Sequence, residues 1–173
     1  LVTGVQTCAL QISGGTMMKH TISALMENRP GVLRRLAGLF GRRGYNIDSI
    51  VASATENEAL TRMTIVVDCS EPMIDQVVKQ MSKLQEIVEV ENVTDLPVVA
   101  RQLLIMKLRA DLETRSDILQ LAQAFGARIV DIRTDSAIIE ATEEDSVTTS
   151  IVETFRPYGI ISMMKTGTVV LKK

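Results

Sequence analysis

Residues 27–50 read ENRPGVLRRLAGLFGRRGYNIDSI and contain the features that decide the fold. Pro30 is suited to the first position of a helix, apolar residues follow at helical spacing at positions 32, 36, 39 and 40, and Gly44 is a typical C-cap after two arginines. The stretch therefore predicts a helix that begins at the Asn28 to Gly31 turn and ends before Gly44. A strand-like pattern resumes at Asn46, so a strand is expected to follow the helix closely.

The flanking segments complete the order strand, helix, strand, strand, helix, strand. Strands are expected at Lys19 to Met26, Asn46 to Thr55, Leu60 to Cys69 and Ile87 to Val93, with a second helix capped by Ser70. After a linker at Thr94 to Val98 the order recurs, with strands at Gln102 to Ala110, Ala127 to Arg133, Ser136 to Thr142, Ile160 to Lys165 and Val169 to Leu171, and helices at Thr114 to Phe125 and Glu143 to Phe155. The predicted fold class is α+β, with two consecutive ferredoxin-like (βαββαβ) domains.

The chain divides into three parts on this interpretation. Residues 1–17 show no periodicity that continues into the rest of the chain, so they are expected to be a non-native or disordered extension, and Met17 or Met18 is expected to be the natural start. The first domain is expected to span residues 18–96 and the second residues 97–173.

Composition excludes several classes of function. The 173 residues include 19 Lys and Arg against 21 Asp and Glu, so there is no positive surplus to bind a nucleic-acid backbone. Two cysteines are too few for a disulfide scaffold or a four-ligand zinc site, which indicates a reducing compartment. No apolar run is long enough to span a membrane. We therefore expect a cytoplasmic protein that binds neither nucleic acid nor membrane.

Catalytic chemistry is also not indicated. His20 is the only histidine, and no serine, cysteine and acid accompany it in a triad pattern, so a polar residue at a strand edge or half-buried in the sheet is the favoured interpretation. Cys69 ends a strand on its apolar face, where a small buried hydrophobe is favoured over a nucleophile. We expect no catalytic residue, no metal site and no cofactor in this chain.

The turn before the first helix is the one candidate binding site. Backbone N–H groups at a helix start have no partners within the helix and attract anions. Gly31 allows a carboxylate to approach the main chain, Asn28 offers a carboxamide, and Val32 and Leu33 could line a pocket for an aliphatic side chain. Together these groups suit an amino acid. From this segment alone, an ordinary capped helix with no ligand is the favoured interpretation, and the amino-acid site is the alternative.

The stretch at residues 27–50, followed by LTRMTIVVD at residues 60–68, resembles the regulatory small subunit of acetolactate synthase (acetohydroxyacid synthase). The resemblance runs from Met18 to the C-terminus. It is strongest through Val93, and in the second half it rests mainly on Lys165, Thr166 and Gly167. It implies an N-terminal ACT domain followed by a C-terminal ACT-like domain.

The resemblance also implies a site. In that family ACT domains of two chains pair into one continuous sheet, and a branched-chain amino acid, chiefly valine, binds across the interface. Carried over position by position, Asn28, Gly31, Val32 and Leu33 would come from one chain and Asn46 and Ile47 from the other. Val32 stands where relatives also have a smaller residue.

The implied function is regulatory. The chain would form a homodimer and bind the catalytic large subunit, which would hold thiamine diphosphate, magnesium and FAD. It would activate that subunit and confer valine feedback inhibition on the biosynthesis of valine, leucine and isoleucine. A free-standing ACT-type amino-acid sensor that regulates another enzyme or a transcription factor is the alternative. An RNA-binding module is disfavoured because residues 60–68 lack paired aromatics, and a small hydrolase is disfavoured because no catalytic pair is present.

Overall fold

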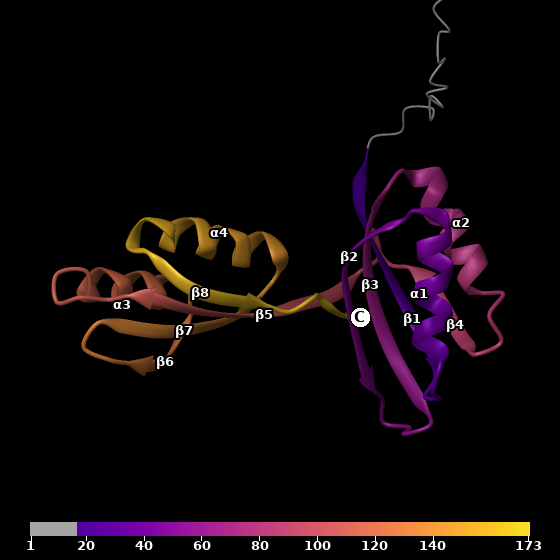
Figure 1. The fold of residues 1–173 in the computed structure, drawn as a ribbon, viewed down its shortest axis with the longest axis horizontal. Helices are drawn as coiled ribbons and strands as arrows, with labels where there is room; N and C mark the ends of the chain where they lie inside the picture. The colour runs from indigo at the N-terminus through magenta and orange to yellow at the C-terminus, as the bar shows by residue number, and fades with distance from the viewer. Residues whose placement is uncertain (1–16) are drawn as a thin grey trace, which may run out of the picture.

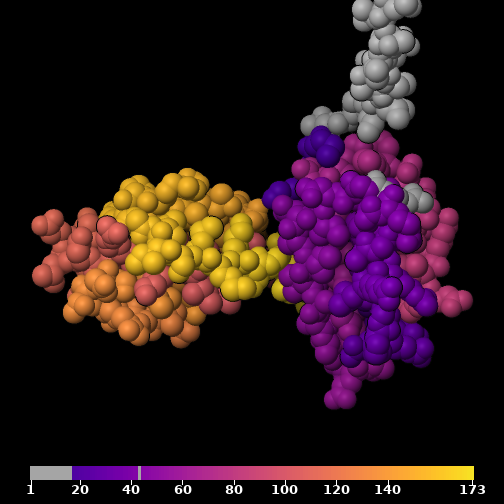
Figure 2. Space-filling view, in the orientation of Figure 1, coloured from indigo at the N-terminus to yellow at the C-terminus, as the bar shows by residue number. Residues whose placement is uncertain are grey.

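The computed structural model describes residues 17–173, so the predicted extension, apart from Met17, lies outside the described part of the chain. The described residues form two α+β domains that lie side by side and are joined by a narrow waist (Figures 1 and 2). Each domain has an antiparallel sheet built from a βαββαβ order, which confirms the predicted fold class. The predicted boundary after residue 96 falls between the last strand of one sheet and the first strand of the next.

The first domain contains four strands and two helices. In chain order they are β1 (Met18–Glu27), α1 (Val32–Arg43), β2 (Asn46–Ala54), β3 (Leu60–Cys69), α2 (Glu71–Met81) and β4 (Ile87–Asn92). The strands are arranged β2-β3-β1-β4, and each neighbouring pair is antiparallel. This order places β2 and β4 at the two edges of the sheet, with both helices on one face (Figure 1).

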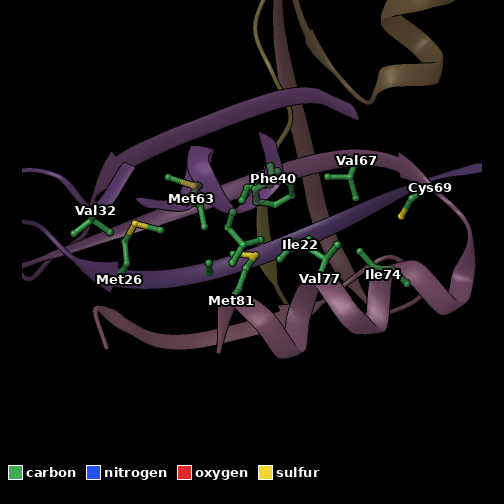
Figure 3. Close-up of a cluster of buried hydrophobic side chains, with 14 residues drawn as sticks. Ile22, Met26, Val32, Phe40, Met63, Val67, Cys69, Ile74, Val77 and Met81 are labelled. Carbon is green, nitrogen blue, oxygen red and sulfur yellow. The ribbon is translucent and has the colours of Figure 1, made fainter. Parts of the chain in front are cut away.

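The core of the first domain lies between the sheet and its helices (Figure 3). Alternate residues of the two central strands point to this side, as the period of a strand requires. The buried set includes Ile22, Ala24, Met26, Leu36, Phe40, Met63, Ile65, Val67, Cys69, Ile74, Val77 and Met81. Complete burial of one large apolar side chain contributes about 1.5–3 kcal/mol, so this layer stabilises both ends of α1.

The second domain repeats the arrangement. Its elements are β5 (Val98–Arg109), α3 (Arg115–Ala124), β6 (Arg128–Ile132), β7 (Ser136–Glu143), α4 (Asp145–Phe155), the short 3₁₀ helix η1 (Arg156–Tyr158), β8 (Ile160–Lys165) and β9 (Val169–Lys172). The main sheet has the order β6-β7-β5-β8, and β9 pairs separately with the start of β5. Leu104, Met106 and Leu108 of β5 pack against Phe155 in a second core.

The start of β5 differs from the prediction. The strand begins at Val98 and not at Gln102, because residues 98–101 pair antiparallel with residues 169–172. We call these two segments the β5–β9 ribbon. The expected linker is correspondingly shorter, since the chain is already in strand conformation directly after Pro97.

The β5–β9 ribbon lies across the face of the first sheet that carries no helix. Lys172 at one end of the ribbon has its Nζ 3.2 Å from Oε1 of Glu89 on β4. Beyond the other end, the turn that precedes β9 reaches β2. Ser23, Thr64 and Val66 on this face are all buried. The ribbon therefore packs the two domains together as well as linking them.

Within residues 17–173 two kinds of feature are absent. No helix there has both the length and the apolar character needed to cross a membrane. No three His, Cys, Asp or Glu side chains there are grouped so that they could hold a metal ion.

Candidate ligand-binding site at the start of the first helix

The turn between β1 and α1 is held in place by its neighbours in the first domain. The N–H of Glu27 donates to the carbonyl of Glu86 at 2.9 Å, and the N–H of Asn28 donates to the carbonyl of Ala59 at 2.8 Å. The carboxamide of Asn28 also donates from Nδ2 to the carbonyl of Glu58 at 3.0 Å. This bond leaves the side-chain oxygen of Asn28 and its second N–H at the surface of the turn.

The helix itself begins later than the sequence predicted. Pro30 lies in the turn and not in the helix, because Gly31 has φ +92° and ψ −15°, a left-handed conformation that interrupts helical geometry before Val32. An ideal Cβ built on Gly31 would meet no heavy atom within 4 Å. A glycine is favoured here by its backbone angle, and the space beside it is open to a ligand.

The first turn of α1 is suited to an anion. It carries no acidic residue, and no side chain caps it. The N–H of Val32 reaches only to the carbonyl of Arg29 at 3.5 Å. The helix provides a partner first for Arg35, whose N–H donates to the carbonyl of Gly31 at 3.1 Å, so the N–H groups of Leu33 and Arg34 have none within the helix. The positive end of the helix dipole therefore meets solvent through main-chain donors.

The two apolar residues expected to line a pocket have different surroundings. The side chain of Val32 is 5% exposed and belongs to the core, whereas Leu33 is 55% exposed. Within one chain Leu33 is thus available to an aliphatic ligand through its side chain, and Val32 only through its main chain. The role of both residues in binding stays a prediction.

The remaining predicted residues, Asn46 and Ile47, lie at the other end of α1. The helix has 12 residues, so its two ends are about 18 Å apart. Asn46 is exposed at the first position of the edge strand β2, and Ile47 packs partly against the core. One chain therefore does not bring the two groups of predicted residues together.

His20 and Cys69 do not form a reactive group. His20 is buried, with 3% of its surface exposed and no hydrogen-bond partner for either ring nitrogen, so the expectation of an edge or half-buried position is wrong. The strand alternation places it on the helix-covered face. Cys69 is buried as predicted, and burial raises the pKa of its thiol, which disfavours the nucleophilic thiolate.

A polar cleft lies between the domains, and no sequence pattern indicated it. This cleft has a volume of about 600 Å³ and is lined by both domains. Lys19 pairs with Asp48 at 2.9 Å on one side, and Lys165 pairs with Asp145 at 2.9 Å on the other. The hydrogen bond to Asp48 raises the pKa of Lys19, and the hydrogen bond from Lys165 lowers the pKa of Asp145. Because the lining residues come from opposite ends of the chain, only the folded arrangement could reveal the cleft.

Comparison with known proteins agrees with both domains. Residues 22–89 match the model of the acetohydroxyacid synthase (AHAS) small subunit-like ACT domain, and residues 101–173 match the model of the small subunit of acetolactate synthase. A probable acetolactate synthase small subunit of Archaeoglobus fulgidus is 44% identical over 154 residues, which cover 89% of this chain and 96% of the relative. The acetolactate synthase small subunit of Mycolicibacterium smegmatis is 39% identical over 158 residues, covering 91% and 92%.

A solved structure extends the agreement to three dimensions. The crystal structure of the acetolactate synthase small subunit from Thermotoga maritima superposes with a TM-score of 0.82 at 35% identity, covering 90% of this chain and 98% of that one. The similarity thus includes both domains and the order in which they follow one another. The chain belongs to the family of acetolactate synthase small subunits.

Proposed function

We propose that this chain is the regulatory subunit of acetolactate synthase, which catalyses no reaction itself, activates the catalytic subunit and confers feedback inhibition by valine. Membership of the small-subunit family supports the regulatory role. The catalytic large subunit is the partner, and thiamine diphosphate, magnesium and FAD belong to that subunit. The chain works in the cytoplasm, in the biosynthesis of the branched-chain amino acids.

The observation that carries the effector part of the proposal is the start of α1. No side chain of the described residues caps this helix start, and the space beside Gly31, where a Cβ would lie, is open. A carboxylate is the group that the main-chain N–H donors of a helix start bind best. Leu33, exposed beside them, offers an apolar contact to an aliphatic side chain. Valine combines these two groups.

A second copy of the chain would supply the missing half of the site. β2 is an edge strand, and Ile50 at its centre is 41% exposed, which favours pairing with another strand. If two copies of β2 pair antiparallel about Ile50, Asn46 of one copy lies near Ala54 of the other, with the register shifted by the bulge between Ile47 and Ser49. Ala54 lies in the same cross-strand row as Thr61 and Met26, at the end of the sheet where α1 begins. The pairing thus brings Asn46 of one copy to the end of the partner's sheet at which α1 begins.

Inhibition requires that valine binds two states of the assembly with different affinities. Couplings between two such sites are typically about 1–3 kcal/mol, or about 5- to 150-fold in affinity. A site shared by two chains meets this requirement, because a change in how the chains pair changes the site itself.

Reconstitution tests the proposal. The full chain is mixed with the catalytic subunit encoded in the same genome, and acetolactate formation is measured with and without millimolar valine. We expect the chain to raise the activity and valine to lower it again. If the chain leaves the activity unchanged yet binds an amino acid by calorimetry, a free-standing sensor is the better description. Sedimentation of the chain as a monomer at micromolar concentration would contradict the shared site.

A further inference from the structure

Gly167 is packed tightly against the first domain. An ideal Cβ built on this residue would lie 2.7 Å from Cγ2 of Val51, 3.0 Å from Cβ of Ser49 and 3.1 Å from its Oγ. Real Cβ atoms do not approach other heavy atoms at 2.7 Å, so only glycine fits this contact without movement. The φ of Gly167 is not in the left-handed region, so its restriction to glycine comes from the contact and not from the backbone angle.

The second-domain side of this contact is held firmly. The N–H of Thr166 donates to the carbonyl of Leu103, and the hydroxyl of Thr166 accepts from the N–H of Leu103, both at 3.0 Å. Lys165 is paired with Asp145 in the first turn of α4, and Gln102 donates to the same carboxylate at 2.9 Å. A displacement of Gly167 would therefore carry β5 and α4 with it.

The first-domain side of the contact is the strand that begins with Asn46 and Ile47. Ser49 and Val51 follow these residues on β2, and the register with β3 shifts between Ile47 and Ser49. A bulge of this kind is a point at which the twist of a strand can change. Asp48 lies within it and pairs with Lys19 of β1. Residues proposed to touch the effector thus lie within about 15 Å of the Gly167 contact along one strand.

We propose that Gly167 is a positioning residue that couples the effector strand β2 to the second domain. The inference rests on the proposed function, because it assumes that Asn46 and Ile47 meet the effector. Effector binding fixes the twist of β2 at the bulge, and this decides whether the turn at Thr166 to Thr168 seats on Ser49 and Val51. The second domain then takes one of two placements relative to the first, and the catalytic subunit meets a different surface in each.

The central variant is Gly167→Ala, which adds one methyl group at the contact. It prevents close seating of the turn and leaves the proposed effector residues unaltered. We expect calorimetry on the full chain to show that valine still binds, with a Kd shifted about fivefold because seating and valine binding are linked, whereas the maximal inhibition of the reconstituted enzyme falls by about half or more. Gly41→Ala is the matched control, because a Cβ at Gly41 meets no heavy atom within 4 Å and its φ is also not left-handed. It should leave both quantities at wild-type values.

The double variant Gly167→Ala with Val51→Ala separates direct contact from general damage. Removing Cγ2 of Val51 relieves the shortest approach, at 2.7 Å, while Ser49 still restricts the turn. We expect part of the lost inhibition to return, and Val51→Ala alone to have a smaller effect than Gly167→Ala. Wild-type maximal inhibition in Gly167→Ala would overturn the proposal. So would lost inhibition without any recovery in the double variant, or loss of valine binding itself.

Hydrogen exchange provides a measurement that does not depend on the effector. In the full chain without valine, Gly167→Ala should increase exchange in peptides from both β2 and residues 160–168, and Gly41→Ala should not. Unchanged exchange in these peptides would contradict the proposal that the Gly167 contact stabilises both segments. If exchange increases as expected while wild-type enzyme shows no response to valine, the proposed effector is wrong and the interdomain contact stands.

Discussion

The two domains differ most where the first strand of each repeat leads into its first helix. In the first domain Gly31 precedes α1, which has no acidic residue in its first turn. In the second domain Asp111 accepts hydrogen bonds from the N–H and the hydroxyl of Thr114 at 2.9 and 2.8 Å, and Asp117 lies in the first turn of α3. The same topological position thus has no carboxylate from the chain itself in one repeat, and has Asp111 and Asp117 in the other.

This difference indicates how the helix start of the first repeat can bind a ligand, while the helix start of the second repeat has only a structural role. A helix start attracts a carboxylate whether that group belongs to the protein or to a ligand. Where the chain supplies its own, as Asp111 does, the N–H of the N-cap residue Thr114 has a partner and the pKa of that carboxyl is held below its ordinary value, mainly by this hydrogen bond. Substitutions that make the two helix starts more alike test the comparison.

The largest effect is expected from Gly31→Asp, which gives α1 a carboxylate of its own. The new charge competes for the donors and repels the carboxylate of the effector. Two like charges about 4 Å apart cost about 4 kcal/mol at an effective dielectric constant near 20, so valine affinity should fall on the order of a hundredfold or more. Acetolactate formation by the reconstituted enzyme should then be insensitive to millimolar valine, with activation retained.

Gly31→Asn is the matched control for this variant. Asn and Asp share their shape and both tolerate the left-handed backbone that Gly31 adopts, at a strain of about 1–2 kcal/mol. The difference in valine affinity between the two variants therefore reports the charge. If Gly31→Asn still responds to valine and Gly31→Asp is inhibited equally, with both variants shown by circular dichroism to be folded, no carboxylate binds at this helix start.

A smaller effect is expected from Asn46→Ala. This change removes one carboxamide proposed to reach the ligand from the second copy, and the exposed position of Asn46 spares the core. A hydrogen bond to a charged group contributes about 1.5–3 kcal/mol, so valine should bind about tenfold or more weakly by calorimetry, with activation of the catalytic subunit largely unchanged. Unaltered valine affinity would show that Asn46 does not contact the ligand.

The smallest effect is expected from Asp111→Asn in the second domain. Asn keeps an acceptor oxygen for Thr114 but does not titrate. Because the folded protein lowers the pKa of Asp111 below 3.8, the stability due to the charged form is present above pH 3.8 and is lost as the pH falls through the folded-state pKa. Between about pH 5 and pH 2 the melting temperature of the wild type should therefore fall more than that of Asp111→Asn. A parallel decline would contradict the role given to this carboxylate.

Local sequence patterns were sufficient to predict most of the secondary structure. β3 at Leu60–Cys69 and β8 at Ile160–Lys165 have the predicted bounds, because alternation and the flanking turns determine where such strands end. Helix α1 ends before Gly44, whose left-handed φ of +67° terminates it as expected. The start of α1 was placed too early, since the preference of Pro30 for a first turn was outweighed by the left-handed conformation of Gly31.

Long-range features were not predictable in the same way. Residues 98–101 become a strand only because they pair with residues 169–172, and nothing in their local pattern specifies that partner. The burial of His20 likewise depends on packing and not on its polarity. For the site, the residue types at Asn28 and Gly31 indicated an anion-binding turn. The distance between Asn46 and that turn was not predictable from residue types, because it depends on the length of α1, which separates them in the folded chain.

The β5–β9 ribbon has a consequence for the order in which the molecule assembles during synthesis. Lys172 pairs with Val98, so one side of the ribbon is translated long before the other, and β9 is the last of the described elements to be made. The first domain can fold as it leaves the ribosome, because all of its strands and helices precede Pro97. During that interval its helix-free face and the edge of β2 are both uncovered. Two nascent chains could therefore pair through β2 before either one has completed the contact at Gly167.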